Sequence, residues 1–395
     1  MQDKRLLVEG WRGISHSIAM VNQHQLLAWS DMPGLQVFHR DMVTYWPNWN
    51  SRDMSAGFAP DDAARLQAVP PPDGAPVDAV YTITFPSPVP AVRRSNTRHI
   101  TFMVTEYGLR PRCIAGPLSE LQAFVRDGNA IVTPSNWSRE RVVEFGFPAE
   151  HVHVVPHAVQ RKTFLPFDAD ERQARRQALG FADEDFVFCN VGLASWNKGI
   201  DHLLTAFAHV RHRHPQARLV IKNNQTMYGA RVETMLDLVT QAHPGLLDED
   251  VMSSIFVINT NLEQADLREL YACTDCYVSP YRAEGFNLPV LESLACATPV
   301  IVTAGGATDD FCRGPWATRV HARPATTPES IMQGGHCLEV DIDALVQAMT
   351  ARLTAADDQR RVSDAGCEAL LNGLSWDRVA RRALEICLPV EACAA

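Results

Sequence analysis

Short apolar runs alternate with amphipathic segments along almost the whole chain. The first part predicts strands at Lys4–Glu9, Val77–Phe85, His99–Thr105, Ala130–Pro134 and Val152–Pro156, and helices at Ser15–Trp29, Leu118–Arg126 and Ser138–Phe145. This alternation is typical of a parallel sheet covered by helices, because parallel neighbours need a crossover connection between them.

A charged stretch, Gln160–Asp185, interrupts the pattern, and we interpret it as an interdomain connection with one helix at Glu171–Leu179. The pattern then restarts. Strands are expected at Phe186–Val191, Arg218–Lys222, Ser254–Ile258, Cys276–Ser279 and Pro299–Thr303, and helices at Gly199–His212, Arg231–Gln241, Gln264–Cys273, Pro289–Ala297, Asp341–Leu353 and Trp376–Cys387. The sequence therefore predicts an α/β protein with two doubly wound domains facing a cleft, and ligand sites at the carboxyl ends of the strands.

Composition narrows the class of protein. A length of 395 residues suits two domains, and 46% hydrophobic with 21% charged residues is typical of globular chains. No apolar run approaches the roughly 20 residues that span a bilayer. The N-terminus is too short and too acidic for a secretory signal, so a cytoplasmic location is expected. The lone pair Cys273 and Cys276 lacks partners for a zinc site and is interpreted as structural.

The net charge of −10 arises almost entirely after residue 162. An acidic balance argues against nucleic acid as a partner, because phosphate-backbone binding needs a basic face. The nearly neutral first part leaves a weak peripheral contact with a membrane open. Its densest basic cluster, Arg93–Arg98, is most simply a solvated loop before a strand.

The most informative stretch is Glu284–Glu292, which follows an expected buried strand. Pro289 suits the first position of a helix, so Glu292 should lie one turn inside that helix. A helix start offers backbone N–H groups and partial positive charge to a phosphate. Two carboxylates would repel a phosphate, but they could accept hydrogen bonds from hydroxyls on both sides of it. The segment therefore indicates a nucleotide sugar, with ribose on one side and hexose on the other.

Three further segments accompany this one: Asn190–Phe207, Thr133–Ser138 and Val155–Val159. Together with Glu284–Val302 they resemble the GT-B glycosyltransferases, specifically glycosyltransferase family 4. The resemblance covers most of the chain from about residue 99. It implies two Rossmann-like domains, an acceptor-side domain at 1–165 and a nucleotide-sugar domain at 166–372, with a helical segment at 373–395 that crosses back to the first domain.

The resemblance also implies roles for individual residues. Glu284 should contact the donor sugar and Glu292 the ribose hydroxyls. Lys198, at the start of a helix, should neutralise the leaving phosphate. Backbone N–H groups should cradle the diphosphate, namely those of Gly285, Phe286, Asn287 and Leu288. The alternative, in which Glu284, Glu292 and Lys198 are ordinary charges at helix starts, is disfavoured by the surrounding match.

One position departs from the family pattern. The family commonly carries an arginine where this chain has Leu193, and leucine cannot grip a phosphate as a guanidinium does. Arg12, Arg282 and Lys222 are candidates to replace it. Arg12 is favoured, because it lies with Gly13 in a glycine-flanked turn after the first strand, which should face the cleft.

Candidates for the acceptor side lie in the first domain. Glu106 ends an expected strand where relatives have histidine or glutamate, and it could position the acceptor or handle its proton, or instead pair with Arg94, Arg110 or Arg112. His16 is a candidate contact of the acceptor or phosphates, although a first-turn histidine is usually structural and Ser15 or Ser17 is the expected helix cap. Trp46 and Trp49 could stack on a sugar ring or equally pack in the core.

The sequence thus predicts transfer of a hexose from a UDP-, GDP- or ADP-linked sugar to a glycan, lipid-linked or other acceptor hydroxyl. The resemblance implies retention at the anomeric carbon and no metal or other cofactor. Asp168 and Asp170 imitate a metal-binding Asp-x-Asp, but they precede a charged helix that they should cap. A catalytically silent sugar-nucleotide-binding or scaffold protein stays open because of Leu193, and an epimerase is a weaker alternative. The base, the hexose, the acceptor and the oligomeric state leave no trace in the sequence.

Overall fold

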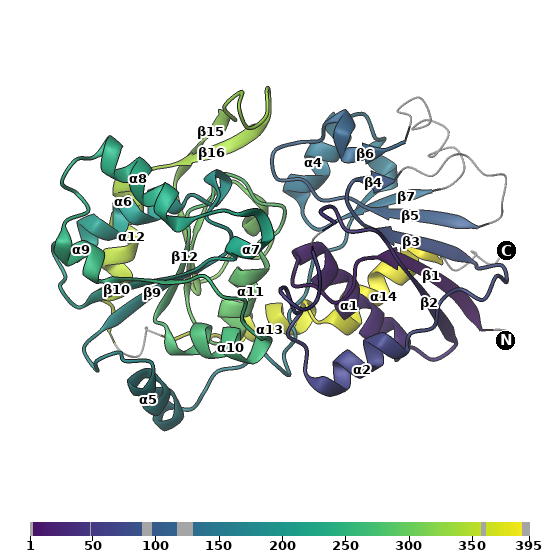
Figure 1. Cartoon of the computed structure of the whole chain (residues 1–395), viewed down its shortest axis with the longest axis horizontal. Coiled ribbons are helices and arrows are strands. Elements are labelled where there is room, and N and C mark those ends of the chain that lie inside the picture. Colours follow the sequence, from purple (N-terminus) through teal and green to yellow (C-terminus); the bar gives the residue numbers. More distant parts are fainter. Residues whose placement is uncertain (1–2, 48, 89–96, 117–128, 357–360, 389–395) are drawn as a thin grey trace. The chain divides into compact units, whose positions relative to one another are not determined.

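The computed structural model describes residues 3–47, 49–88, 97–116, 129–356 and 361–388. The chain forms two compact units (Figure 1), one comprising Met1–Ala158 with Leu374–Ala395 and the other Val159–Gly373. The helix predicted at Leu118–Arg126 and residues 93–96 of the basic cluster lie outside the described residues. No helix in the described part of the chain is both long and apolar enough to cross a membrane.

The first unit contains a six-stranded parallel sheet in the order β2-β1-β3-β5-β7-β8. Its strands are β1 (Lys4–Gly10), β2 (Leu35–Asp41), β3 (Ala79–Ile83), β5 (Arg98–Phe102), β7 (Ala130–Thr133) and β8 (Val152–Val154), and a short pair is formed by β4 (Ser87–Pro88) and β6 (Ile114–Ala115). The helices are α1 (Ser17–Ser30), α2 (Pro60–Ala68), α4 (Asn136–Glu144) and α14 (Trp376–Cys387). The last of these packs on α1, where the Trp29 Nε1–H donates to the Ala380 carbonyl at 2.8 Å.

The second unit contains another six-stranded parallel sheet, in the order β11-β10-β9-β12-β13-β14. Its strands are β9 (Phe186–Val191), β10 (Ala217–Lys222), β11 (Ile255–Ile258), β12 (Cys276–Ser279), β13 (Val300–Thr303) and β14 (Ala317–Val320), followed by the antiparallel hairpin of β15 (Ala322–Thr326) and β16 (His336–Val340). The chain runs outward from β9 to β11 and then resumes beside β9 at β12. This reversal is the switch point at which doubly wound sheets bind ligands.

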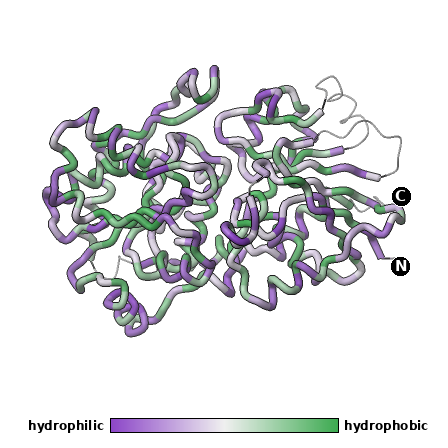
Figure 2. Tube along the Cα trace, in the orientation of Figure 1, coloured by the Kyte–Doolittle hydropathy of each residue, from purple (hydrophilic) through white to green (hydrophobic). Residues whose placement is uncertain are grey.

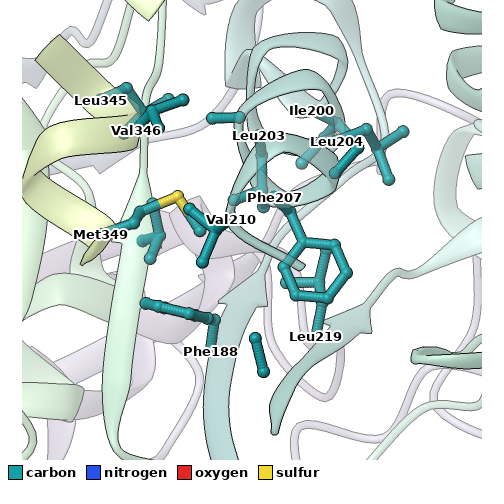
Figure 3. Close-up of a cluster of buried hydrophobic side chains, with 14 of the residues drawn as sticks. Phe188, Ile200, Leu203, Leu204, Phe207, Val210, Leu219, Leu345, Val346 and Met349 are labelled. Atoms are coloured by element: carbon teal, nitrogen blue, oxygen red, sulfur yellow. The ribbon is translucent and has the colours of Figure 1, made fainter. Parts of the chain in front are cut away.

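Helices cover both faces of the second sheet. They are α5 (Ala169–Ala178), α6 (Ile200–Arg211), α7 (Gln225–Tyr228), α8 (Val232–Ala242), α9 (Glu249–Ser253), α10 (Gln264–Cys273), α11 (Leu288–Ala295), α12 (Ile342–Leu353) and α13 (Ala365–Gly373). On one face, Phe207 of α6 and Met349 of α12 pack with Phe188 of β9 in a fully buried cluster (Figure 3). The central strands are hydrophobic along their length, whereas α5 is mostly hydrophilic (Figure 2). The prediction of two parallel-sheet α/β units is thereby confirmed.

The charged stretch before β9, which the sequence analysis interpreted as an interdomain connection, belongs to the second unit. Arg172 and Arg176 of α5 reach Asp275, at 2.6 and 3.0 Å, and Asp275 also accepts from the Val187 N–H at 2.8 Å. Because Asp275 and Arg176 are both buried, removal of either residue would leave the other as an uncompensated buried charge. These bonds hold α5 to the second unit, while Asp168 caps its start by accepting from the Glu171 N–H, as predicted.

A close approach of two backbones fixes the loops at the switch point. Gly199 stands between the short turn Trp196–Lys198 and α6, with φ of +66°, and a Cβ placed on it would lie 2.0 Å from the Pro280 carbonyl oxygen. The Arg282 and Ala283 N–H groups both donate to the Asn197 carbonyl, at 2.7 and 3.2 Å. The loops that follow β9 and β12 are therefore joined without a side chain between them.

This contact should make Gly199 sensitive to substitution. Gly199→Ala should lower the free energy of unfolding by about 3 kcal/mol, combining about 1 kcal/mol for the left-handed backbone with about 2 kcal/mol for the steric conflict. Gly229→Ala is the matched control, because Gly229 has φ of +69° but a Cβ placed on it would meet no atom within 4 Å. Urea unfolding of both variants measures the difference, and equal losses would contradict the account.

Candidate functional site

The candidate site lies at the carboxyl ends of β9 and β12. Lys198 follows β9 and Glu284 follows β12, so both belong to the loops that Gly199 joins. The Lys198 Nζ lies 2.8 Å from the Glu284 Oε1, and their side chains are only 20% and 10% exposed. The structure thus brings together two residues that the sequence placed in one site, and it pairs them directly.

The start of α11 is fixed to the end of β12 by a side-chain hydrogen bond. Asn287 occupies the N-cap position with φ of +80°, a conformation that asparagine tolerates better than most residues. Its Nδ2–H donates to the Ser279 Oγ at 2.9 Å. Helix α11 begins at Leu288, so Pro289 is its second residue rather than its first. The segment from Gly285 to Leu288 thereby leads into a helix start, where backbone N–H groups can face an anion.

Glu292 lies in the second turn of α11 with its carboxylate against α10. The Tyr271 hydroxyl donates to its Oε2 at 2.8 Å. Burial raises the pKa of Glu292 to about 7, although the hydrogen bond from Tyr271 acts in the opposite direction. At neutral pH the carboxyl group is therefore divided between its protonated and ionised forms, so a partner that donates hydrogen bonds can decide its state.

Tyr271 was missed by the sequence analysis. It is fully buried, and its ring contacts that of Tyr277 on β12, with 6.0 Å between the centroids. Nothing in the local pattern distinguishes this tyrosine from an apolar residue of an amphipathic helix. Asn197 was likewise missed, although it ties the two loops by donating from Nδ2 to the Ala283 carbonyl at 3.3 Å.

The three cations considered as replacements for the arginine differ in their surroundings. Arg12 forms a two-pronged contact with Asp41, at 2.9 and 2.7 Å, and donates to the Leu66 carbonyl. Arg282 makes a similar pair with Asp201, at 2.7 and 2.6 Å, and reaches Glu339 at 3.1 Å.

Lys222, the last residue of β10, has no such pair. Among the described residues no carboxylate lies within ion-pair distance of this buried lysine. Burial lowers the pKa of Lys222 to about 8.

In the first unit, β5 ends at Phe102, so Glu106 lies in a bend beyond the strand rather than at its end. The prediction that the strand reaches Thr105 is wrong. The Glu106 carbonyl accepts from the Trp137 Nε1–H at 2.7 Å, which fixes the backbone of this bend to α4. The role of the Glu106 side chain stays a prediction.

His16 takes the N-cap position of α1, which the sequence analysis had assigned to Ser15 or Ser17. Its Nδ1 accepts from the Ile18 N–H at 3.1 Å, and burial lowers the pKa of His16 to about 4. The imidazole is therefore neutral, as an acceptor at a helix start must be. The buried Trp49 packs beside it, with 5.1 Å between the ring centroids.

Two other predicted positions of the first unit have different environments. Trp46 is 48% exposed and packs edge-on against Tyr45. Gly13 has φ of +79°, and its N–H donates to the Gln23 Oε1 at 2.9 Å, which fastens the turn after β1 to α1. Within the described ranges, no three His, Cys, Asp or Glu side chains come together as metal ligands would.

Comparison with known proteins places this geometry in a family context. Residues 171–331 match the family model "Glycosyl transferases group 1". A D-inositol 3-phosphate glycosyltransferase of Xylanimonas cellulosilytica is 25% identical over 299 residues, which cover 74% of this chain and 65% of that protein. The chain spans 35% to 65% of the length of three curated relatives that it matches: this enzyme, a mannosylfructose-phosphate synthase of Agrobacterium fabrum and an MMP alpha-(1->4)-mannosyltransferase of Mycolicibacterium hassiacum.

Solved structures share the fold of the whole chain. A glycosyltransferase from Rickettsia africae has a TM-score of 0.69 at 13% identity, covering 99% of this chain and 100% of that one. Anabaena Alr3699/HepE, solved in complex with UDP and glucose, has a TM-score of 0.62 at 12% identity, covering 98% and 99%. The chain therefore has the GT-B fold, and its second unit carries a glycosyltransferase group 1 domain.

Proposed function

We propose that the protein is a family 4 glycosyltransferase that moves a hexose from a nucleoside diphosphate sugar to an acceptor hydroxyl, with retention and without a metal ion. The observation that carries the proposal is the Lys198–Glu284 pair beside the start of α11, with Glu292 one turn further on. The cation and the helix start suit the phosphates of such a donor, and the two carboxylates suit the hydroxyls on either side of them. The group 1 domain match and the UDP complex of a structural neighbour support this choice.

Donor binding would use the two carboxylates differently. Glu292 would accept hydrogen bonds from the ribose, which requires its ionised form. Glu284 would accept from hexose hydroxyls, while the diphosphate lies at the helix start between them. Before the donor binds, Lys198 and Glu284 satisfy each other in a largely buried place. A donor that brings both phosphate oxygens and hydroxyls can replace both halves of this pair without leaving a charge buried alone.

In the proposed reaction the acceptor oxygen attacks the anomeric carbon on the face from which the diphosphate departs. The bond between the anomeric carbon and the phosphate oxygen breaks, and the acceptor's proton passes to the leaving diphosphate. Lys198 and the backbone N–H groups would stabilise the charge that develops on that group. Glu106, His16, Trp46 and Trp49 remain proposals for the acceptor side, with a glycan or lipid-linked saccharide as the proposed acceptor.

The function can be tested with UDP-, GDP- and ADP-linked hexoses. One of them should raise the melting temperature, and the purified protein should release its nucleoside diphosphate. A ligand at 100 times its Kd stabilises by about 2.7 kcal/mol, enough for a clear shift. If all three leave both the melting temperature and the nucleotide concentration unchanged, the proposed function is wrong.

The two carboxylates should affect the binding of different parts of the donor. Glu292→Ala should lower the affinity for the bare nucleoside diphosphate about 10-fold or more, because it removes the ribose contact. Glu284→Ala should leave the affinity for the bare nucleotide within about 3-fold of the wild-type value. It should remove the additional affinity that the hexose gives to the nucleotide sugar. Calorimetry with the nucleotide and the nucleotide sugar measures both, and identical behaviour of the two variants would refute the assignment.

The raised pKa of Glu292 predicts how stability depends on pH. Folding disfavours its ionised form, so this group's contribution is present below the ordinary value of 4.5 and is lost as pH rises through about 7. Relative to Glu292→Gln, the wild-type protein without ligand should therefore lose on the order of 2 kcal/mol between pH 5 and pH 8. Urea unfolding at both pH values measures this change. Glu249→Gln, at an exposed glutamate of α9, is the control and should show no comparable trend.

A further inference from the structure

Lys222 is a buried cation that the fold does not neutralise. It ends β10, and only 6% of the residue is exposed. Across the described part of the chain it forms no ion pair or side-chain hydrogen bond. Desolvation is the cause of its lowered pKa of about 8, so at neutral pH it is still mostly protonated. A lysine whose side chain is mostly removed from water and whose charge meets no carboxylate is costly, and its retention points to a partner that the protein itself does not supply.

The register of the sheet places Lys222 next to the loop that lacks its arginine. Lys222 is the partner of Val191 on β9, and the Gly192 N–H donates to the Lys222 carbonyl at 3.0 Å. Leu193 is the next residue along that loop. A Cβ on Gly192 would meet nothing within 4 Å, so open space adjoins the backbone there.

The same register shows which face of the sheet Lys222 occupies. Cys189 pairs with Val220 and with Tyr277, so these three residues share one face. Two residues further along each strand the chain returns to that face, at Lys222 and Ser279. Ser279 is the residue that accepts the hydrogen bond from Asn287. Lys222 therefore lies on the face of the sheet over which the start of α11 is held.

The other candidate cations are already engaged. The guanidinium of Arg12 is held by Asp41 and that of Arg282 by Asp201, each through two hydrogen bonds of 2.6 to 2.9 Å. Either arginine would have to give up a two-pronged carboxylate contact to take a phosphate. Lys222 would exchange no such contact. The sequence favoured Arg12, whereas the contacts favour Lys222.

We propose that Lys222 binds the diphosphate of the nucleotide and takes the place of the arginine that is absent at position 193. The inference rests on the proposed function, because it assumes that a nucleoside diphosphate occupies the ends of β9 and β12. The phosphate supplies the counter-charge that the mostly buried lysine lacks. Lys198, on the loop after β9, would act on the same diphosphate from another direction.

Binding of UDP, GDP and ADP, with the matching nucleosides and monophosphates, tests the proposal by calorimetry. Lys222→Met keeps the length of the side chain and removes its charge, and at a buried position it should not lower the melting temperature of the free protein. The variant should bind the preferred nucleoside diphosphate at least 10-fold more weakly than the wild type does. Its affinity for the matching nucleoside should stay within 2-fold of the wild-type value. Lys162→Met, at an exposed lysine of the same unit, should change neither.

A second variant restores the cation at the other position. In Lys222→Met combined with Leu193→Arg, an arginine stands where the family carries it, and the diphosphate should regain most of its lost affinity. Lys222 does not bind the phosphates if Lys222→Met has the wild-type affinity for the diphosphate. The same holds if the variant loses affinity for the nucleoside and the diphosphate equally. If the wild type binds none of the three diphosphates, the proposed function itself fails.

Discussion

The architecture of the candidate site depends on the contact of Gly199 with the Pro280 carbonyl. Two loops that leave neighbouring parallel strands, β9 and β12, would normally be kept apart by side chains. Here the absence of a Cβ lets their backbones touch, and the Asn197 carbonyl accepts two N–H groups across the junction. Lys198 and Glu284 sit on either side of that junction, so their pairing is a consequence of backbone packing rather than its cause.

Around this junction the second unit keeps several charges in places where water is largely excluded. Lys198 and Glu284 neutralise each other, burial raises the pKa of Glu292 to about 7, and Lys222 stays without a carboxylate partner among the described residues. Each arrangement is less favourable than full solvation would be. A nucleotide sugar carries phosphates for the two lysines and hydroxyls for the two glutamates. Under the proposed function, the electrostatic cost of these arrangements would be relieved by such a ligand and would favour it over ligands that lack phosphates or hydroxyls.

The central strands and their helices could be predicted because parallel strands buried on both faces give continuous apolar runs. Strand β2 and helix α2 were missed, since the strand lies at a sheet edge and Leu66 is the one buried residue of the helix. The hairpin of β15 and β16 was missed because Pro324 and exposed positions hide the strand pattern. Lys198 and Glu284 could be placed at strand ends, but the bond of Tyr271 to Glu292 and the isolation of Lys222 depend on tertiary contacts that the sequence does not encode locally.

In the proposed function, this site transfers a hexose, and the diphosphate leaves from the same face that the acceptor attacks. The most direct measurement is proton NMR of the anomeric signal during turnover, with whichever nucleotide hexose stabilises the protein. The account predicts that the first product to form has the same anomeric configuration as the donor. A first product of opposite configuration would contradict it, because inversion requires attack from the face away from Lys198 and the start of α11.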